Sequence, residues 1–127
     1  MLYVALVFAG LAALVHVYIF VLESLRWEAP STRAVFGTDE NTAAITKPLA
    51  YNQGFYNLFL AIGTIAGIGL SGPNREAGVA LVVFGTGSML TAALVLIGSD
   101  RSKARAAVVQ GAFPLIALLD LAVWALS

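Results

Sequence analysis

The sequence predicts an all-α integral membrane protein, a bundle of four transmembrane helices with short surface helices in its first connecting segment. Sixty per cent of the 127 residues are hydrophobic and 11% are charged, whereas about 25% of the residues in a soluble domain are charged. Each of four apolar stretches also reaches the ~20 residues that a helix needs to cross a bilayer. They cover residues 2–25, 48–70, 77–97 and 106–126. Because they fill residues 1–127 almost completely, we expect one membrane domain.

The first span begins at Leu2 and is expected to remain in the mature protein. No Lys or Arg precedes it, and the apolar run is longer than the hydrophobic region of a secretory signal. It ends among Glu23, Arg26, Trp27 and Pro30. An aromatic residue, charges and then a proline are typical of a helix that reaches the membrane interface and stops.

The polar segment after the first span is predicted to hold two short helices at the membrane surface. Ser31 can cap the first, which Gly37 ends. Thr38 or Asp39 can cap the second, which is expected to stop near Lys47.

The other three spans follow from their boundaries. Pro48 suits the first turn of the second span, and the turn at residues 71–74 ends that span. A charged segment at residues 99–105 separates the third span from the fourth. Continuous apolar runs longer than 18 residues favour helices over the alternating strands of a β-barrel.

Gly63 and Gly67 have the GxxxG spacing that lets membrane helices approach closely. The spacing predicts packing inside the bundle, and a homo-oligomer formed through Gly63 and Gly67 is the alternative.

The first and third connecting segments carry most of the positive charge. Their six basic residues are Arg26, Arg33, Lys47, Arg101, Lys103 and Arg105. The side of the membrane that holds both termini has only Arg75. By the positive-inside rule we expect the two basic segments in the cytoplasm and both termini outside.

Composition also excludes several classes of function. The formal net charge is zero and no basic patch exists, so no nucleic-acid partner is expected. The absence of cysteine excludes thiol chemistry and disulfides, and a single histidine makes a metal site unexpected. No cofactor is predicted, and the lipid bilayer is the one partner that composition itself indicates.

Polar side chains inside the spans are the candidate site, because hydrocarbon rejects them unless they are paired. The set is His16, Glu23, Asn52, Gln53, Asn57 and Gln110. His16 and Glu23 share a face of the first span, since seven residues make two helical turns. Gln53 and Asn57 share a face of the second span at a spacing of four. Their depths coincide, so these groups are expected to converge inside the bundle.

Two accounts of this convergence stay open. One is a clamp of interhelical hydrogen bonds, each contributing about 0.6 kcal/mol. The other is a pocket open to the cytoplasm, in which the histidine and the amides bind a ligand and Glu23 accepts a proton or a cation. Asp120, in the outer half of the fourth span, either reaches the interface or also handles a proton.

Four blocks of sequence stand out together: HVYIFVLE from His16, VFG from Val35, NQGFYN from Asn52 and VQGAFP from Val109. In this order they resemble a widespread family of small bacterial four-span membrane proteins, catalogued as domain of unknown function 1304. The resemblance covers essentially the full chain and implies an inner-membrane location, but no reaction. Val15 stands where many members have Glu, which weakens any mechanism that needs a carboxylate there.

The sequence therefore predicts a protein that binds or moves a small amphipathic or lipid-like molecule. The alternatives are a proton-coupled exporter that uses Glu23 and an accessory subunit of a membrane complex. An enzyme is disfavoured, because His16 and Glu23 lie about 10 Å apart along the helix axis. A base and its orienting group need a direct hydrogen bond.

Overall fold

The computed structural model describes residues 1–127, which form helices and no strands. Four helical segments are long and apolar enough to cross a membrane. They are Leu2–Leu25, Glu40–Leu70, Arg75–Ser99 and Arg101–Leu126. The predicted all-α fold class and the multi-pass architecture are confirmed.

The elements follow one another with short connections. They are α1 (Leu2–Phe20), the π-helical η1 (Val21–Leu25), α2 (Pro30–Phe36), α3 (Glu40–Leu70), α4 (Arg75–Ser99), the 3-10 turn η2 (Arg101–Lys103) and α5 (Ala104–Leu126). The connection between α1 and α3 contains η1 and α2, and the connection between α4 and α5 contains η2.

The first connecting segment holds one separate helix where the sequence predicted two. α2 starts with Pro30 in its first turn, and its N-cap is Ala29, not Ser31. It ends at Gly37, whose φ of 65° lies in the left-handed region that glycine adopts without strain. The expected end of this helix is therefore confirmed.

The second predicted surface helix is the beginning of α3. The Asp39 side chain accepts a hydrogen bond from the backbone N–H of Thr42 at 2.7 Å and caps the helix, as expected. The helix then continues through Pro48, so the predicted stop near Lys47 is wrong. Pro48 removes only one backbone hydrogen bond, and the residue four positions earlier is exposed, where water can bind its carbonyl. The 31 residues of α3 extend over about 46 Å, longer than the hydrocarbon core.

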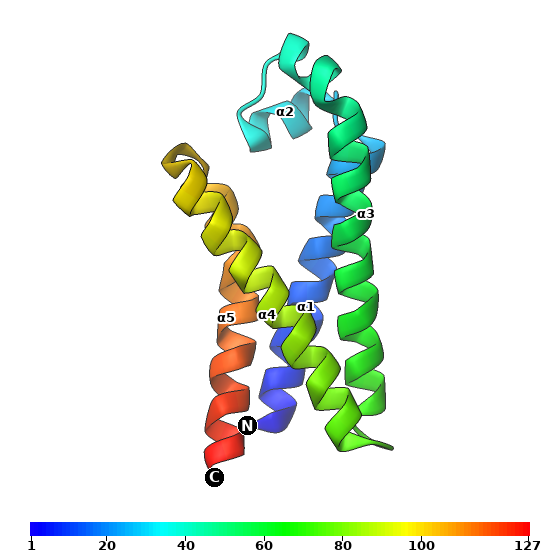
Figure 1. Ribbon diagram of the computed structural model, residues 1–127, viewed down its shortest axis with the longest axis vertical. Coiled ribbons are helices and arrows are strands. Elements are labelled where there is room, and N and C mark those ends of the chain that lie inside the picture. The colour runs from blue at the N-terminus through cyan, green and yellow to red at the C-terminus, as the bar shows by residue number, and fades with distance from the viewer.

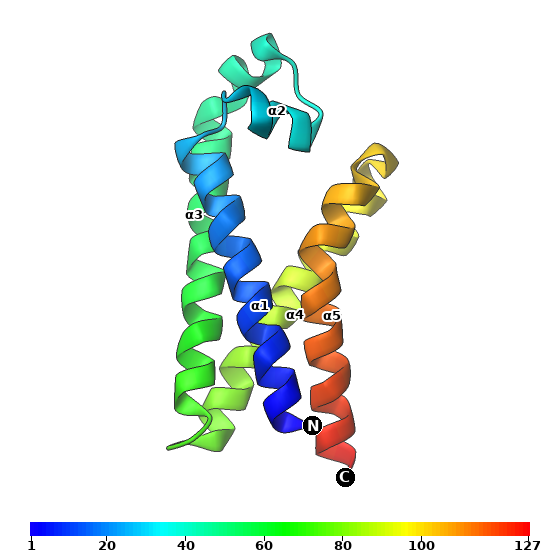
Figure 2. The same cartoon turned by 180° about the vertical axis from the view of Figure 1, so that it is seen from behind.

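The spans form two pairs that are joined at one end and spread apart at the other (Figures 1 and 2). α1 lies beside α3, and α4 lies beside α5. Both termini and the α3–α4 turn lie at the closed end, which we call the terminal end. The connecting segments lie at the other end, the connector end, where α2 sits over the opening between the pairs (Figure 1).

Small residues close the terminal end. The apolar core there consists of Leu2, Ala5, Ala9, Val82, Ala117 and Leu121. A Cβ placed on Gly67 would lie 2.8 Å from the carbonyl oxygen of Gly78, so α3 and α4 touch almost backbone to backbone. A Cβ on Gly63 would meet no atom within 4 Å. Gly67 therefore packs against α4 of the same chain. Contact between two copies of the protein through Gly63 stays a prediction.

Candidate functional site

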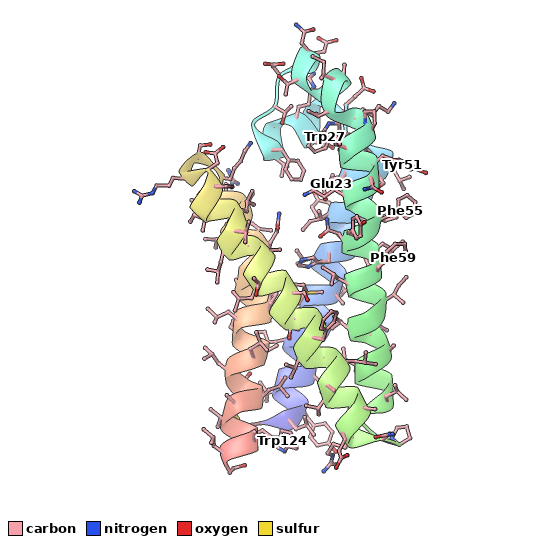
Figure 3. All side chains as sticks on the ribbon, viewed as in Figure 1. Glu23, Trp27, Tyr51, Phe55, Phe59 and Trp124 are labelled. Atoms are coloured by element: carbon pink, nitrogen blue, oxygen red, sulfur yellow. The ribbon has the colours of Figure 1, made fainter.

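Glu23 and Asn57 face each other between α1 and α3 at the connector end. Asn57 Nδ2 donates a hydrogen bond to Glu23 Oε1 at 2.6 Å and another to the Gln53 carbonyl at 3.3 Å. Glu23 is only 5% exposed, so this bond supplies the partner that a buried carboxyl group needs. The structure thus brings together two residues that the sequence assigned to one site; Figure 3 labels Glu23 at this position.

Two further hydrogen bonds join η1 and the turn that follows it to α3. Ser24 Oγ donates to the carbonyl of Tyr51 at 2.7 Å, and Trp27 Nε1 donates to Thr46 Oγ1 at 3.1 Å. Together with the Glu23–Asn57 bond they form a series that we call the polar row. Sequence reasoning missed Ser24 and Thr46, although small hydroxyl residues are common where membrane helices meet.

Gly54 lets α3 approach η1 at the middle of the polar row. A Cβ on Gly54 would overlap the Ser24 hydroxyl and lie 3.0 Å from the Ser24 backbone nitrogen. It would also lie 3.1 Å from Glu23 Cβ. Only a residue without a side chain fits, so Gly54 sets the separation at which the polar row can form.

Glu23 and Ser24 lie on η1, the π-helical end of the first span. Single π-helical turns inside α-helices are rare and occur frequently at functional sites. The wider turn changes the register of the side chains that follow α1, so the α-helical spacing used to align His16 with Glu23 does not extend through η1.

His16 is buried apart from the polar row. Its Nδ1 lies 2.9 Å from the carbonyl oxygen of Ala12, one turn earlier in α1, and must carry the proton of that hydrogen bond. His16 is 1% exposed and lines none of the three cavities described below. His16 and Glu23 share no hydrogen bond, as their separation in sequence predicts.

Three of the predicted polar residues each line a different cavity. Gln53 is the one α3 residue at a wide, open groove of about 820 Å³ whose other lining residues lie on α4; we call this groove the α3–α4 cavity. Gln110 lines a second, of about 370 Å³, between α1, α2 and α5, the α2–α5 cavity. Glu23 lines a third, of about 240 Å³, the Glu23 cavity. The sequence predicted that these side chains share one pocket, whereas in the structure they line separate cavities. At this depth the α1–α3 pair and the α4–α5 pair have already spread apart.

The remaining candidates, Asn52 and Asp120, line none of these three cavities. Asn52 is exposed on α3, and Asp120 is partly exposed on α5. Asp120 lies toward the terminal end, two turns of helix from the end of the chain, far from the polar row along the bundle.

The α2–α5 cavity combines a largely apolar wall with three side chains that carry polar groups, those of Tyr18, Arg105 and Gln110. Eight of its ten lining residues are hydrophobic, so its interior suits a hydrocarbon group. Its apolar residues include Ile19, Leu22, Val35, Phe36 and Val109. Arg105 is its only charged residue, and Gln110 its only amide.

A contact between the two basic connecting segments holds α2 over this cavity. Lys103 Nζ donates a hydrogen bond to the backbone carbonyl of Phe36, in the last turn of α2. We call this contact the latch. Hydrogen bonds from the hydroxyl and the backbone N–H of Ser102 lower the pKa of Asp100. The Asp100 carboxylate therefore caps η2 and fixes the turn that carries Lys103.

The Glu23 cavity has a different character, because charged residues surround it. Arg26, Glu28 and Lys47 line it together with Glu23. Lys47 Nζ lies 3.0 Å from Glu28 Oε1, but their side chains are 62% and 47% exposed. An ion pair this exposed contributes little to stability, so it covers the cavity without closing it firmly.

Aromatic residues cover the outer surface of α3. Figure 3 shows Tyr51, Phe55 and Phe59 one below the other on this helix. The ring of Phe55 lies 5.0 Å from the ring of Phe20, edge to face. Tyr51 and Phe59 are more than half exposed, which suits side chains that face lipid and not a ligand.

A family model described as "Protein of unknown function (DUF1304)" matches residues 10–122. Comparison with curated proteins and with solved structures gave no match.

Proposed function

Because the chain belongs to the DUF1304 family of proteins of unknown function, we propose its function from its own geometry: it binds or moves a small amphipathic or lipid-like molecule at the connector end. The family match confirms the resemblance that the four sequence blocks carried. The four apolar helices make the protein a small multi-pass membrane protein.

The observation that carries this proposal is the α2–α5 cavity. Its volume of about 370 Å³ falls in the range of about 300–1,000 Å³ that is usual for small-molecule sites. Its wall is largely apolar, and its Arg105 and Gln110 side chains come from α5, while Tyr18 of α1 adds a hydroxyl group. An amphipathic molecule matches such a lining, because its chain removes apolar surface from water while its head meets the polar groups.

The position of the cavity suits a molecule that arrives from the membrane surface. Its residues come from the connector end of α1, from α2 and from the first two turns of α5 (Figure 2). The closed core lies at the opposite end of the bundle. A ligand could therefore enter without separating the helices that hold the fold together.

We place this end in the cytoplasm and both termini outside, in a bacterial inner membrane. The side of the membrane follows from the six basic residues of the first and third connecting segments. The membrane itself follows from the family resemblance. The ligand would then bind from the cytoplasmic face.

The polar row favours the clamp for Glu23 and Asn57. Three hydrogen bonds and the close approach at Gly54 hold α1 against α3, so one helix pair is fixed while the opening lies between pairs. We therefore assign ligand binding to the α2–α5 cavity and not to the Glu23–Asn57 pair. Gln110 alone among the six sequence candidates stays in that role.

A proton-coupled exporter is the second candidate. The observation that favours it is that Glu23, a buried carboxyl group in a membrane span, also lines a cavity with Arg26 and Lys47. Ionisable groups in spans commonly mark the path of a proton or an ion. Uptake of protons by reconstituted vesicles in exchange for a cationic dye, lost in Glu23→Gln, would support this candidate.

Thermal melting of the purified protein with added single-chain amphipaths tests the first candidate. A ligand that binds only the folded state raises the melting temperature as its concentration rises. Val109→Phe should abolish this rise, because Val109 lines the cavity. Val108→Phe is the matched control, since the neighbouring Val108 is exposed and does not line it.

If no amphipath changes the melting temperature, the proposal fails. A rise that requires a partner protein would instead indicate an accessory subunit.

A further inference from the structure

We infer that the α2–α5 cavity selects an anionic amphipath, a single hydrocarbon chain that carries a phosphate or carboxylate group, and that Arg105 binds this group. The inference rests on the proposed function and adds the chemical class of the ligand.

The charge of the cavity points to an anion. Arg105 is the only charged residue in the lining, and no acidic residue lines it. A guanidinium group can donate two parallel hydrogen bonds to a phosphate or a carboxylate. The Lys103 ammonium group adds positive charge nearby, at the carbonyl of Phe36, which is itself a lining residue.

Three acidic residues near this end, Glu23, Glu28 and Asp100, are engaged elsewhere. Glu23 and Glu28 line the Glu23 cavity, and they bond to Asn57 and Lys47. Asp100 caps η2 through Ser102. None of these carboxylates lines the α2–α5 cavity, so none competes with a ligand for Arg105.

The arrangement along the bundle gives the ligand a direction. Arg105 lies in the first turn of α5, at the connector end, and Val109 lies one turn further into the span. Ile19 faces the same cavity from α1. A headgroup at Arg105 therefore stays at the membrane interface, where a charge is tolerated, and the chain extends along the apolar wall.

The size of the cavity favours one chain over two. At about 370 Å³ it is near the lower limit of the usual range for small-molecule sites. A phospholipid with two chains would leave one chain outside, whereas a single chain can occupy the apolar wall completely.

Trp27 lines the Glu23 cavity and provides a signal for occupancy of the α2–α5 cavity through its contact with Phe36. Its ring lies 5.1 Å from the ring of Phe36, which lines the cavity. Trp124, the only other tryptophan, lies at the terminal end (Figure 3). In a Trp124→Phe background, fluorescence therefore reports on Trp27 alone.

The experiment titrates this variant, in nanodiscs of phosphatidylcholine, with dodecyl phosphate and with dodecyltrimethylammonium. These probes share the chain and differ in the sign of the head. We expect a saturable change with dodecyl phosphate and binding of the cation at least about tenfold weaker, as loss of a charge-assisted hydrogen bond implies. Arg105→Gln should remove this preference and weaken binding of dodecyl phosphate about tenfold. Arg105→Lys should restore part of it.

Arg101→Gln is the matched control, because Arg101 lies on η2 in the same connecting segment and does not line the cavity. It removes the same charge and should bind dodecyl phosphate as the parent does. Equal binding of the two probes, or an equal effect of Arg101→Gln and Arg105→Gln, would overturn the selection of an anion and leave amphipath binding intact. If neither probe gives a saturable change, the proposed function fails together with the inference.

Discussion

The Nδ2 atom of Asn57 lies 2.6 Å from Oε1 of Glu23, although 34 positions separate the two residues in the sequence. This hydrogen bond is the deepest member of the polar row that joins α1 and η1 to α3. It satisfies a buried carboxyl group and orients it toward α3. The bond therefore stabilises the packing of the first span against α3. The apolar α2–α5 cavity lies on the opposite side of α1.

Asn57→Ala should lower stability and leave ligand binding intact. The substitution leaves the buried Glu23 carboxyl group without its side-chain partner, which costs about 1–3 kcal/mol. Thermal melting and the Trp27 titration measure the two effects separately. Asn52→Ala, on the exposed side of the same helix, should melt as the parent does. If the Asn57→Ala variant loses ligand binding while its melting temperature stays unchanged, Asn57 is instead part of the binding site.

Gly54→Ala should destabilise the protein where Gly63→Ala does not. The new methyl group at Gly54 overlaps the Ser24 hydroxyl and crowds the η1 backbone, and overpacking of this kind costs about 1–3 kcal/mol. At Gly63 the methyl group meets nothing within 4 Å, so the higher helix propensity of alanine should stabilise slightly. Equal melting temperatures for the two variants would show that α3 does not approach η1 at Gly54.

Lys103→Ala should loosen α2 without unfolding the spans. The latch is the hydrogen bond from Lys103 to the Phe36 carbonyl, and α2 has only seven residues to hold it in place. Hydrogen exchange of residues 30–36 should become faster, while exchange in the core of α4 stays slow. Lys47→Ala, which breaks only an exposed ion pair, should leave exchange in α2 unchanged. Slow exchange in both variants would show that other contacts hold this helix.

Single cysteines should distinguish the two faces of the membrane, and the natural chain contains none that would interfere. With the basic segments in the cytoplasm, a cysteine at Thr42 or Ser102 should resist an impermeant thiol reagent in intact cells. A cysteine at Asn74 or Ser127 should react. The reverse pattern, or equal labelling of all four positions, contradicts the proposed orientation.

The sequence by itself determined the spans and several of their ends. Hydrophobic length is a local property, so the four apolar runs predict four helices wherever those helices later pack. The cap at Asp39 and the left-handed end at Gly37 are equally local, since each depends on hydrogen bonds or dihedral angles within a few residues. The stop near Lys47 was wrong because one proline in an exposed turn is too weak a signal to end a capped helix.

Only the tertiary structure decided which polar groups meet. Equal depth in the membrane placed His16, Glu23, Gln53, Asn57 and Gln110 at one level, but depth says nothing of the direction in which each helix face points. The π-helical turn of η1 and the missing side chain of Gly54 bring Glu23 to Asn57. The spread of the helix pairs leaves Gln53 and Gln110 in separate cavities. Helix crossing angles arise from the packing of all four spans together, so no local stretch of sequence contains them.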